Sequence, residues 1–140
     1  MNMIEKAIKI ALDAHSGQVD KANKPYILHP LRLMLKMKNE LDMITAVLHD
    51  VLEDSSYTEV ELLREGVPED VVNAVKCMTK DGVQTYESYL AQIKTNDMAS
   101  RVKIADIEDN IDLTRLKNIN SRDLDRIAKY HKALINLKND

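Results

Sequence analysis

The stretch AVLHDVLEDS carries two pairs of polar residues, His49-Asp50 and Glu53-Asp54, inside an otherwise apolar segment. The apolar periodicity of residues 42–54 predicts a helix, and at about 100° per residue all four polar side chains fall on the face opposite the apolar one. Three carboxylates on one face with no intervening Lys or Arg repel each other, and a bound cation would relieve that repulsion. A solvated polar face is the alternative, although such a face has no need of a histidine.

Two other segments supply donors of the same kind. KPYILHP holds His29 between apolar residues and a proline, where a structural role at a helix start is the alternative to a ligand role. VKIADIEDN places Asp106 within the apolar stripe of a helix expected over 97–116, with Asn110 one turn later. A carboxylate buried without a partner is costly, so Asp106 needs a cation, an Arg or partial exposure to water.

Together these segments offer two imidazoles and two carboxylates as candidate metal ligands: His29, His49, Asp50 and Asp106. Nitrogen and oxygen donors without a thiolate suit a six-coordinate divalent ion such as Mn²⁺, with Fe²⁺, Zn²⁺, Co²⁺ or Ni²⁺ as alternatives. Such an ion lowers the pKa of a bound water and can generate hydroxide near neutral pH. The second acidic pair of the opening stretch could accept the proton or orient the nucleophile.

The elements that must position these side chains are helical almost throughout. Thr58 and Glu61 form a capping box, and Ser121 is the expected N-cap of the last helix. With three glycines, three prolines and no repeat or linker, residues 1–140 are expected to form one domain, an all-α bundle of roughly seven or eight short helices. The expected helices lie near 4–12, 29–39, 42–54, 58–66, 68–78, 85–95, 97–116 and 121–138.

Composition and charge narrow the class of protein. A net charge of −3 with both signs interspersed argues against a nucleic-acid binder. No apolar run approaches the ~20 residues of a membrane span, and Glu5 and Asp13 interrupt the N-terminal stretch, unlike a secretory leader. The single Cys77 cannot form an internal disulfide, and a P-loop and a GxGxxG motif are absent. We expect a cytosolic protein with a small-molecule partner; the oligomeric state does not follow from the sequence.

Five segments, in order and in spacing, resemble the HD hydrolase domain of RelA/SpoT proteins: AHSGQ, KPYILHP, LHDVLED, MTK and VKIADIEDN. The resemblance covers roughly residues 3–116, and its specific part is the combination of PYxxHP, HDxxED and KxADxxxN. It implies the all-α HD fold with one Mn²⁺ on the four candidate ligands. It also implies that Glu53 and Asp54 activate water.

The same resemblance implies a reaction: removal of the 3′-diphosphate of ppGpp and pppGpp as pyrophosphate, by a stand-alone small alarmone hydrolase. Asn110 matches a residue that contacts the substrate nucleoside. Lys21 falls in the loop where the family places basic residues against base and phosphate. We expect Lys21 and Lys103 to neutralise phosphate charge.

Three positions on the purine side depart from the family pattern. Asp20 and Ile107 stand where the family often has arginine, and Leu113 stands where it has threonine. The metal and water-activating residues are intact. Hydrolysis of a different nucleotide or phosphate ester is therefore the first alternative. A non-catalytic metal or nucleotide sensor is the second, although such a module would not require both Glu53 and Asp54.

Overall fold

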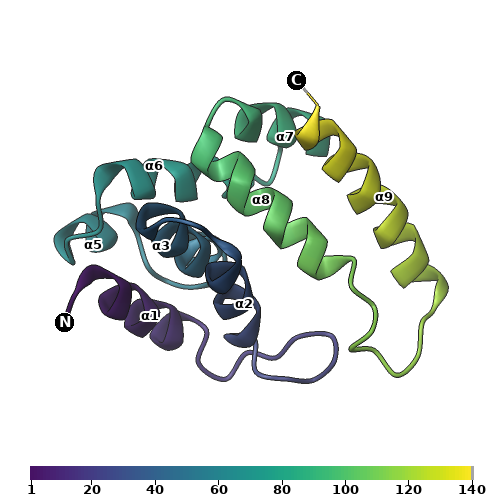
Figure 1. The fold of residues 1–140 in the computed structure, drawn as a ribbon, viewed down its shortest axis with the longest axis horizontal. Coiled ribbons are helices and arrows are strands. Elements are labelled where there is room, and N and C mark those ends of the chain that lie inside the picture. The colour runs from purple at the N-terminus through teal and green to yellow at the C-terminus, as the bar shows by residue number, and fades with distance from the viewer. Residues whose placement is uncertain (140) are drawn as a thin grey trace.

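The computed structural model describes residues 1–139, and its regular secondary structure is helical (Figure 1), as the sequence predicts. Nine helical segments lie in this range, because one helix expected as continuous is divided in two. They are α1 (Met3–Ala14), α2 (Leu28–Lys36), α3 (Glu40–Leu48), α4 (Val51–Asp54), α5 (Glu59–Arg64), α6 (Glu69–Cys77), α7 (Tyr86–Lys94), α8 (Asp97–Asn110) and α9 (Ser121–Lys138).

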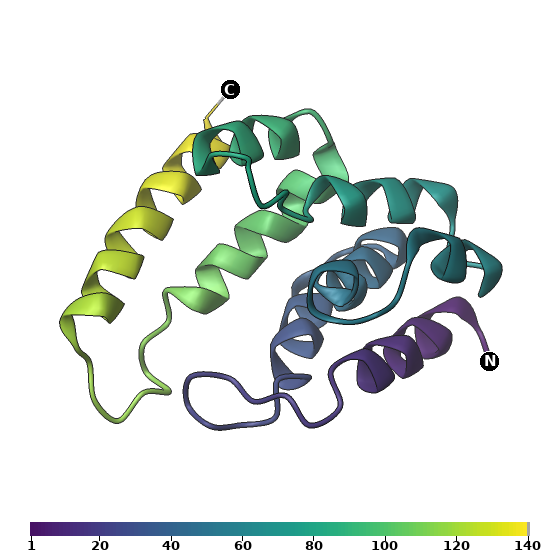
Figure 2. The same cartoon turned by 180° about the vertical axis from the view of Figure 1, so that it is seen from behind.

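Two helices, α3 and α8, form the centre of the bundle. Helix α3 packs against α1, α2, α6 and α8, and α8 packs against α2, α3, α6, α7 and α9. Figures 1 and 2 show α1 and α9 on opposite sides of this pair. The long loops before α2 and before α9 lie at the same end of the bundle. Fully buried aliphatic side chains fill the space between the helices, among them Leu33, Ile44, Leu48, Ile93 and Ile107.

Side-chain caps explain where several helices begin. Asn39, Thr58 and Asn96 each accept a hydrogen bond from a backbone N–H in the first turn of the following helix. The capping box of Thr58 and Glu61 is confirmed. The expected N-cap Ser121 is wrong, because Asn120 caps α9 and Ser121 is the first helical residue.

The helix expected over 42–54 is interrupted at His49 and Asp50. The backbone N–H of His49 turns to the carbonyl of Ala46, three residues back, and Nδ1 of the His49 ring lies 2.7 Å from the same oxygen. The break directs His49 into the interior, where 2% of its surface is exposed. Glu53 and Asp54, on α4, stay exposed. The single polar face expected over these residues is therefore not formed.

The helix expected over 97–116 is also shorter than predicted, since α8 ends at Asn110. Just beyond it, the carboxylate of Asp112 accepts hydrogen bonds from the backbone N–H and the hydroxyl of Thr114. Such a local turn offers the backbone an alternative to further helix. Leu113 and Leu116 consequently lie in the loop before α9. None of the helices in residues 1–139 combines the length and apolar character that crossing a membrane requires.

Candidate active site

Three buried donors meet where α2, α3 and α8 pack together. His29 comes from the first turn of α2, His49 from the break after α3, and Asp106 from the C-terminal half of α8. Their exposed fractions are 4%, 2% and 6%. Partial exposure to water, the alternative for Asp106, is therefore wrong. His29 lies between two carboxylates, Asp106 and Asp109, an arrangement that fits both a ligand role and a structural role at the helix start.

The distances within this group are those of neighbouring ligands on one cation. Oδ1 of Asp106 lies 2.9 Å from Nε2 of His29 and 3.5 Å from Nε2 of His49. All three ligand atoms lie within 4.8 Å of one another. Two ligands bound at ~2.1 Å and at right angles are separated by about 3 Å. His29, His49 and Asp106 therefore form a group that can hold a metal ion.

The second ring nitrogen of His49 supports the same interpretation. With Nδ1 held by the Ala46 carbonyl, Nε2 is buried and has no hydrogen-bond partner. Oδ2 of Asp50 is only 3.0 Å away, close enough for an ion pair but not aligned as a hydrogen bond. A buried nitrogen left unpaired beside carboxylate oxygens is costly. A divalent cation bound between Nε2 of His49 and these carboxylate oxygens would give the nitrogen and the oxygens a partner.

The charged neighbours of Asp106 and His49 shift the pKa values of both side chains. Burial raises the pKa of Asp106, but the ammonium of Lys103 and the two histidines outweigh it and hold that pKa well below its ordinary value. Burial lowers the pKa of His49, but Asp50 and Asp106 outweigh it and raise that pKa well above its ordinary value. The Asp106 carboxylate thus carries a negative charge, as a cation ligand must, and an ion that binds here has to displace the proton that the raised pKa keeps on His49.

Asp50, the fourth candidate ligand, lies beside the group rather than within it. Its Oδ2 atom faces His49 and also accepts a hydrogen bond from the hydroxyl of Tyr26. Asp50 is not part of the set whose ligand atoms are all mutually close. The tyrosine occupies one side of the carboxylate and restricts how Asp50 turns.

Glu53 and Asp54 lie one turn beyond these donors, at the surface. Oε1 of Glu53 accepts a hydrogen bond of 3.2 Å from the backbone N–H of Lys80. The side chain of Gln18 donates to the carbonyl of Asp54 at 3.0 Å. Partial burial, together with the nearby charge of Asp50, raises the pKa of both carboxyl groups. A carboxylate with a raised pKa is a better proton acceptor.

Lys103 and Asn110, two of the three expected substrate contacts, both bond to Asp106. Nζ of Lys103 lies 2.8 Å from Oδ2, and Nδ2 of Asn110 donates to Oδ1 at 3.0 Å. Burial lowers the pKa of Lys103, but the charge of Asp106 outweighs it and raises that pKa. The structure thus brings both residues to the metal-ligand group.

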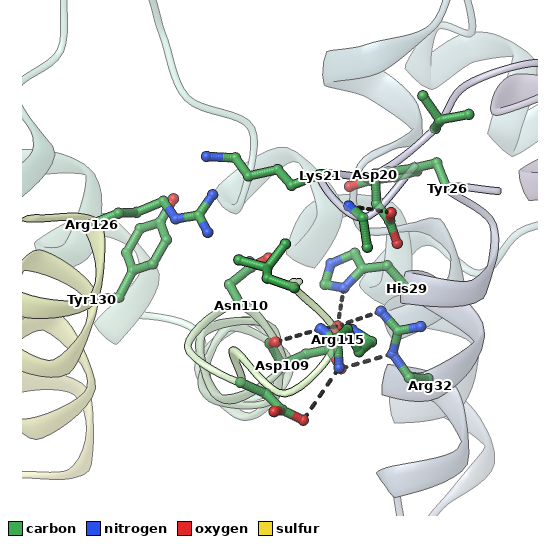
Figure 3. A pocket seen from close by; sticks show the side chains of 14 residues that line it. Asp20, Lys21, Tyr26, His29, Arg32, Asp109, Asn110, Arg115, Arg126 and Tyr130 are labelled. Carbon is green, nitrogen blue, oxygen red and sulfur yellow. Dashed lines mark hydrogen bonds and ion pairs between the residues drawn. The ribbon is translucent and has the colours of Figure 1, made fainter. Parts of the chain in front are cut away.

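A pocket of about 410 Å³ opens beside His29 (Figure 3). Its walls come from the loop before α2, from α2 itself, from the end of α8, from the following loop and from α9. It contains four cations, Lys21, Arg32, Arg115 and Arg126, and two tyrosines, Tyr26 and Tyr130. Lys21 and Arg126 extend into it from opposite walls (Figure 3). Of the expected contacts, Asn110 lines it and Lys103 does not.

Several known proteins resemble this chain. It is 39% identical over 94 residues to a guanosine-3′,5′-bis(diphosphate) 3′-pyrophosphohydrolase of Aquifex aeolicus, covering 64% of the chain and 13% of that protein. It is 31% identical to the protein of the same name in Borreliella burgdorferi, covering 90% and 21%. A solved structure of a metazoan SpoT orthologue superposes with a TM-score of 0.81 at 20% identity, covering 99% of this chain and 87% of that one.

The chain belongs to the RelA/SpoT family as an HD hydrolase domain. The solved structure establishes the HD fold, and the two relatives connect the sequence to the family. No family model matches. This RelA/SpoT domain spans about a fifth or less of the length of the two curated relatives.

The departures from the family pattern have different structural positions in this RelA/SpoT domain. Asp20 lines the pocket, and its Oδ1 atom accepts hydrogen bonds of 2.9 Å from the backbone N–H groups of Ala22 and Lys24. Ile107 is buried in the core, with 1% of its surface exposed. Leu113 is not among the pocket-lining residues. Of the three, only Asp20 is placed to meet a ligand in the pocket.

Sequence reasoning missed the α9 wall of the pocket. Arg126 and Tyr130 are four residues apart, a spacing that puts them on one face of a helix. That spacing was the available signal, but no local feature says what the face meets. Tyr26 belongs to the PYxxHP motif, which was identified without a role for the tyrosine. Asp109, which lies on the same face of α8 as Asp106, was not singled out either.

Proposed function

We propose that this chain is a metal-dependent pyrophosphohydrolase that removes the 3′-diphosphate of a guanosine alarmone of the ppGpp type. The observation that carries the proposal is the group of His29, His49 and Asp106, with ligand spacing, beside a pocket into which Lys21 and Arg126 extend. The names of the relatives in Aquifex aeolicus and Borreliella burgdorferi support the choice of substrate.

The ion-binding residues in this proposal are His29, His49, Asp50 and Asp106, and Mn²⁺ is the proposed ion because oxygen and nitrogen donors suit it. When bound, the ion supplies Lewis acidity that lowers the pKa of a water. Tyr26 orients Asp50 through its hydroxyl, and Asn110 orients Asp106. These contacts hold the carboxylates toward the two imidazoles.

The exposed pair Glu53 and Asp54 performs the proton chemistry in this proposal. Both carboxylates lie one turn after Asp50 and are exposed, so that a water can reach them. One accepts the proton of the attacking water, and the other orients that water. Glu53 is held by the backbone N–H of Lys80, so its direction is fixed before substrate arrives.

The pocket beside His29 binds the nucleotide in this proposal. Lys21 and Arg126 provide positive charge for phosphate from two walls. Tyr26 and Tyr130 offer aromatic surface to the base, and Asn110 offers a polar contact to the sugar. Lys103, beside Asp106, neutralises charge where the scissile diphosphate approaches the ligands.

A direct test is to incubate the Mn²⁺-loaded protein with ppGpp, pppGpp and a panel of unrelated nucleotides, and to identify the products. We expect pyrophosphate with GDP or GTP, and faster turnover than for any unrelated nucleotide. Removal of the ion with a chelator should abolish turnover, and Mn²⁺ should restore it. Turnover of ppGpp no faster than that of unrelated nucleotides would refute the alarmone assignment.

Asp20 favours one alternative, hydrolysis of a different nucleotide or phosphate ester. Its carboxylate places negative charge at the pocket where the family pattern has arginine, which disfavours a highly phosphorylated ligand. The same panel distinguishes the alternatives. Three expectations stay predictions from the sequence. They are that residues 1–140 form a single HD-type domain, that the protein is cytosolic, and that it has no nucleic-acid or membrane partner.

A further inference from the structure

The carboxylate of Asp109 connects a candidate ligand histidine to an arginine. Oδ2 of Asp109 accepts a hydrogen bond of 2.7 Å from Nδ1 of His29. The guanidinium of Arg32 donates to both carboxylate oxygens, from Nε and Nη2, at 2.9 Å each. Asp109 is 3% exposed. Figure 3 shows the three side chains together at one edge of the pocket.

We propose that Asp109, held by Arg32, is a positioning residue that prepares His29 for the metal ion. The inference rests on the proposed metal site. Both ring nitrogens of His29 face carboxylates, Nδ1 toward Asp109 and Nε2 toward Asp106. When an ion takes the place of a proton on Nε2, the remaining ring proton lies on Nδ1, directed at Asp109. An anionic acceptor on the far nitrogen fixes the tautomer and the ring plane and makes the ligand nitrogen more basic.

The two histidines of the site are held in the same way by different acceptors. Nδ1 of His49 lies against the carbonyl of Ala46, a neutral group on its own helix. Nδ1 of His29 lies against a buried carboxylate from another helix, α8. Ligand orientation at His49 is thus built into the local backbone. Orientation at His29 depends on a side chain that can be changed without altering the chain around His29.

Arg32 lines the nucleotide pocket, yet both of its bonded nitrogens face Asp109. Arg115 is similarly engaged, because its Nη2 donates to the Asp109 carbonyl at 2.8 Å and its Nη1 donates to Asp112 at 3.3 Å. These two cations neutralise the acidic edge of the pocket. Loss of Arg32 should therefore weaken metal binding more than nucleotide binding.

A structural ion pair between α2 and α8 is the competing explanation, and the chain contains a matched control. Arg101 donates to both oxygens of Asp42, at 2.7 and 3.0 Å, and Asp42 is also 3% exposed. This pair joins α3 to α8 with the same chemistry, but Asp42 bonds to Asn39 and Arg101 and to none of the candidate ligands. Substitutions there report the effect of losing such a pair on folding alone.

The test measures the Kd of Zn²⁺ and of Mn²⁺ by competition with a chelator, and the thermal midpoint of the metal-free proteins. We expect Asp109→Ala to raise the Kd by about 10- to 100-fold. Asp109→Asn should have a smaller effect, since its amide oxygen can still accept the His29 proton, and Arg32→Gln should lie between the two. Asp42→Ala should leave the Kd within about twofold of wild type, because distant sites act independently.

Proton–nitrogen correlation spectra of the Zn²⁺-loaded protein add a measurement that does not depend on the stability of the fold. The His29 ring should carry its proton on Nδ1, and Asp109→Ala should shift or broaden that resonance. An unchanged Kd in Asp109→Ala, or an equal rise in Asp42→Ala, overturns the inference. Wild-type protein that binds the ion without hydrolysing ppGpp refutes the proposed function and leaves the inference standing. Wild-type protein that binds neither ion overturns both.

Discussion

Nε2 of His29 and Oδ1 of Asp106 lie 2.9 Å apart, although 77 residues separate them in the chain. The contact joins α2 to α8, and His49 approaches the same oxygen from the break after α3. Packing of the three helices thus determines whether the donors converge. The site therefore needs all three segments, because only the packed fold brings two imidazoles to one buried carboxylate.

Binding of the ion should stabilise the folded protein. A ligand that binds only the native state at a concentration of 100 times its Kd adds about 2.7 kcal/mol to the free energy of unfolding. We expect Mn²⁺ to raise the thermal midpoint of wild type by several degrees and that of His49→Gln by much less. Calorimetric scans with and without Mn²⁺ measure the difference. An equal rise in both proteins would mean that the ion binds elsewhere.

Replacing Glu53, one of the two carboxylates proposed to activate the water, should separate catalysis from metal binding. We expect Glu53→Gln to lower kcat by roughly 10²- to 10⁴-fold, because the neutral amide can neither accept the proton of the attacking water nor orient that water as a carboxylate does. The bound metal should be retained, since Glu53 is not among the candidate ligands. Steady-state kinetics and metal analysis of the same preparation provide both numbers. Unchanged turnover would exclude Glu53 from activating the water, and no turnover in wild type with the ion bound would favour the sensor alternative.

Asp20 should control affinity for phosphate through its charge. Asp20→Asn keeps the side-chain oxygen that accepts hydrogen bonds from Ala22 and Lys24, and it removes the negative charge at the pocket. We expect KM for ppGpp to fall about two- to fivefold, in keeping with the ~1 kcal/mol or less of an exposed charge interaction. The effect should shrink as salt is added. A KM that rises, or that is insensitive to salt, would place the phosphates away from this loop.

Removing the charge of Lys21, on the same loop, should have the opposite effect on KM and should leave the affinity for the ion unchanged. We expect Lys21→Met to raise KM for ppGpp by roughly fivefold, since one cation facing phosphate is lost. The Kd for Mn²⁺ should not change, because Lys21 lies in the pocket rather than at the metal ligands. Comparing the two constants in one variant checks the assignment. A rise in the metal Kd alone would exclude a phosphate role for Lys21.

The start of α9 should matter for stability. Asn120 caps this helix by accepting from the backbone N–H of Asp123, whose carboxylate accepts from the N–H of Asn120. Asn120→Ala should lower the free energy of unfolding by about 1 kcal/mol. Urea denaturation measures the change, and Asn120→Ser is the matched control because serine also caps well. Equal losses in both variants would mean that the cap is not what stabilises this end.

The sequence predicts which side chains can bind a metal ion better than it predicts where those side chains lie in the fold. The types and periodicity of the residues around His29, His49 and Asp106 predicted the donors and the all-α class, because both follow from local pattern. The break at His49 was missed because a ring nitrogen near the Ala46 carbonyl is invisible to periodicity. Arg126 was missed for another reason: its role depends on where α9 packs, and that is decided by contacts between distant parts of the chain.

The central claim is that the imidazoles of His29 and His49 hold one divalent ion with Asp106 and that this ion supports release of pyrophosphate. Metal quantification after dialysis, followed by a ppGpp assay on the same samples, tests it most directly in wild type and in His29→Gln. We predict one ion per chain and pyrophosphate release in wild type, with both lost in His29→Gln. Metal retained at full occupancy in His29→Gln, or pyrophosphate released without any ion, would contradict it.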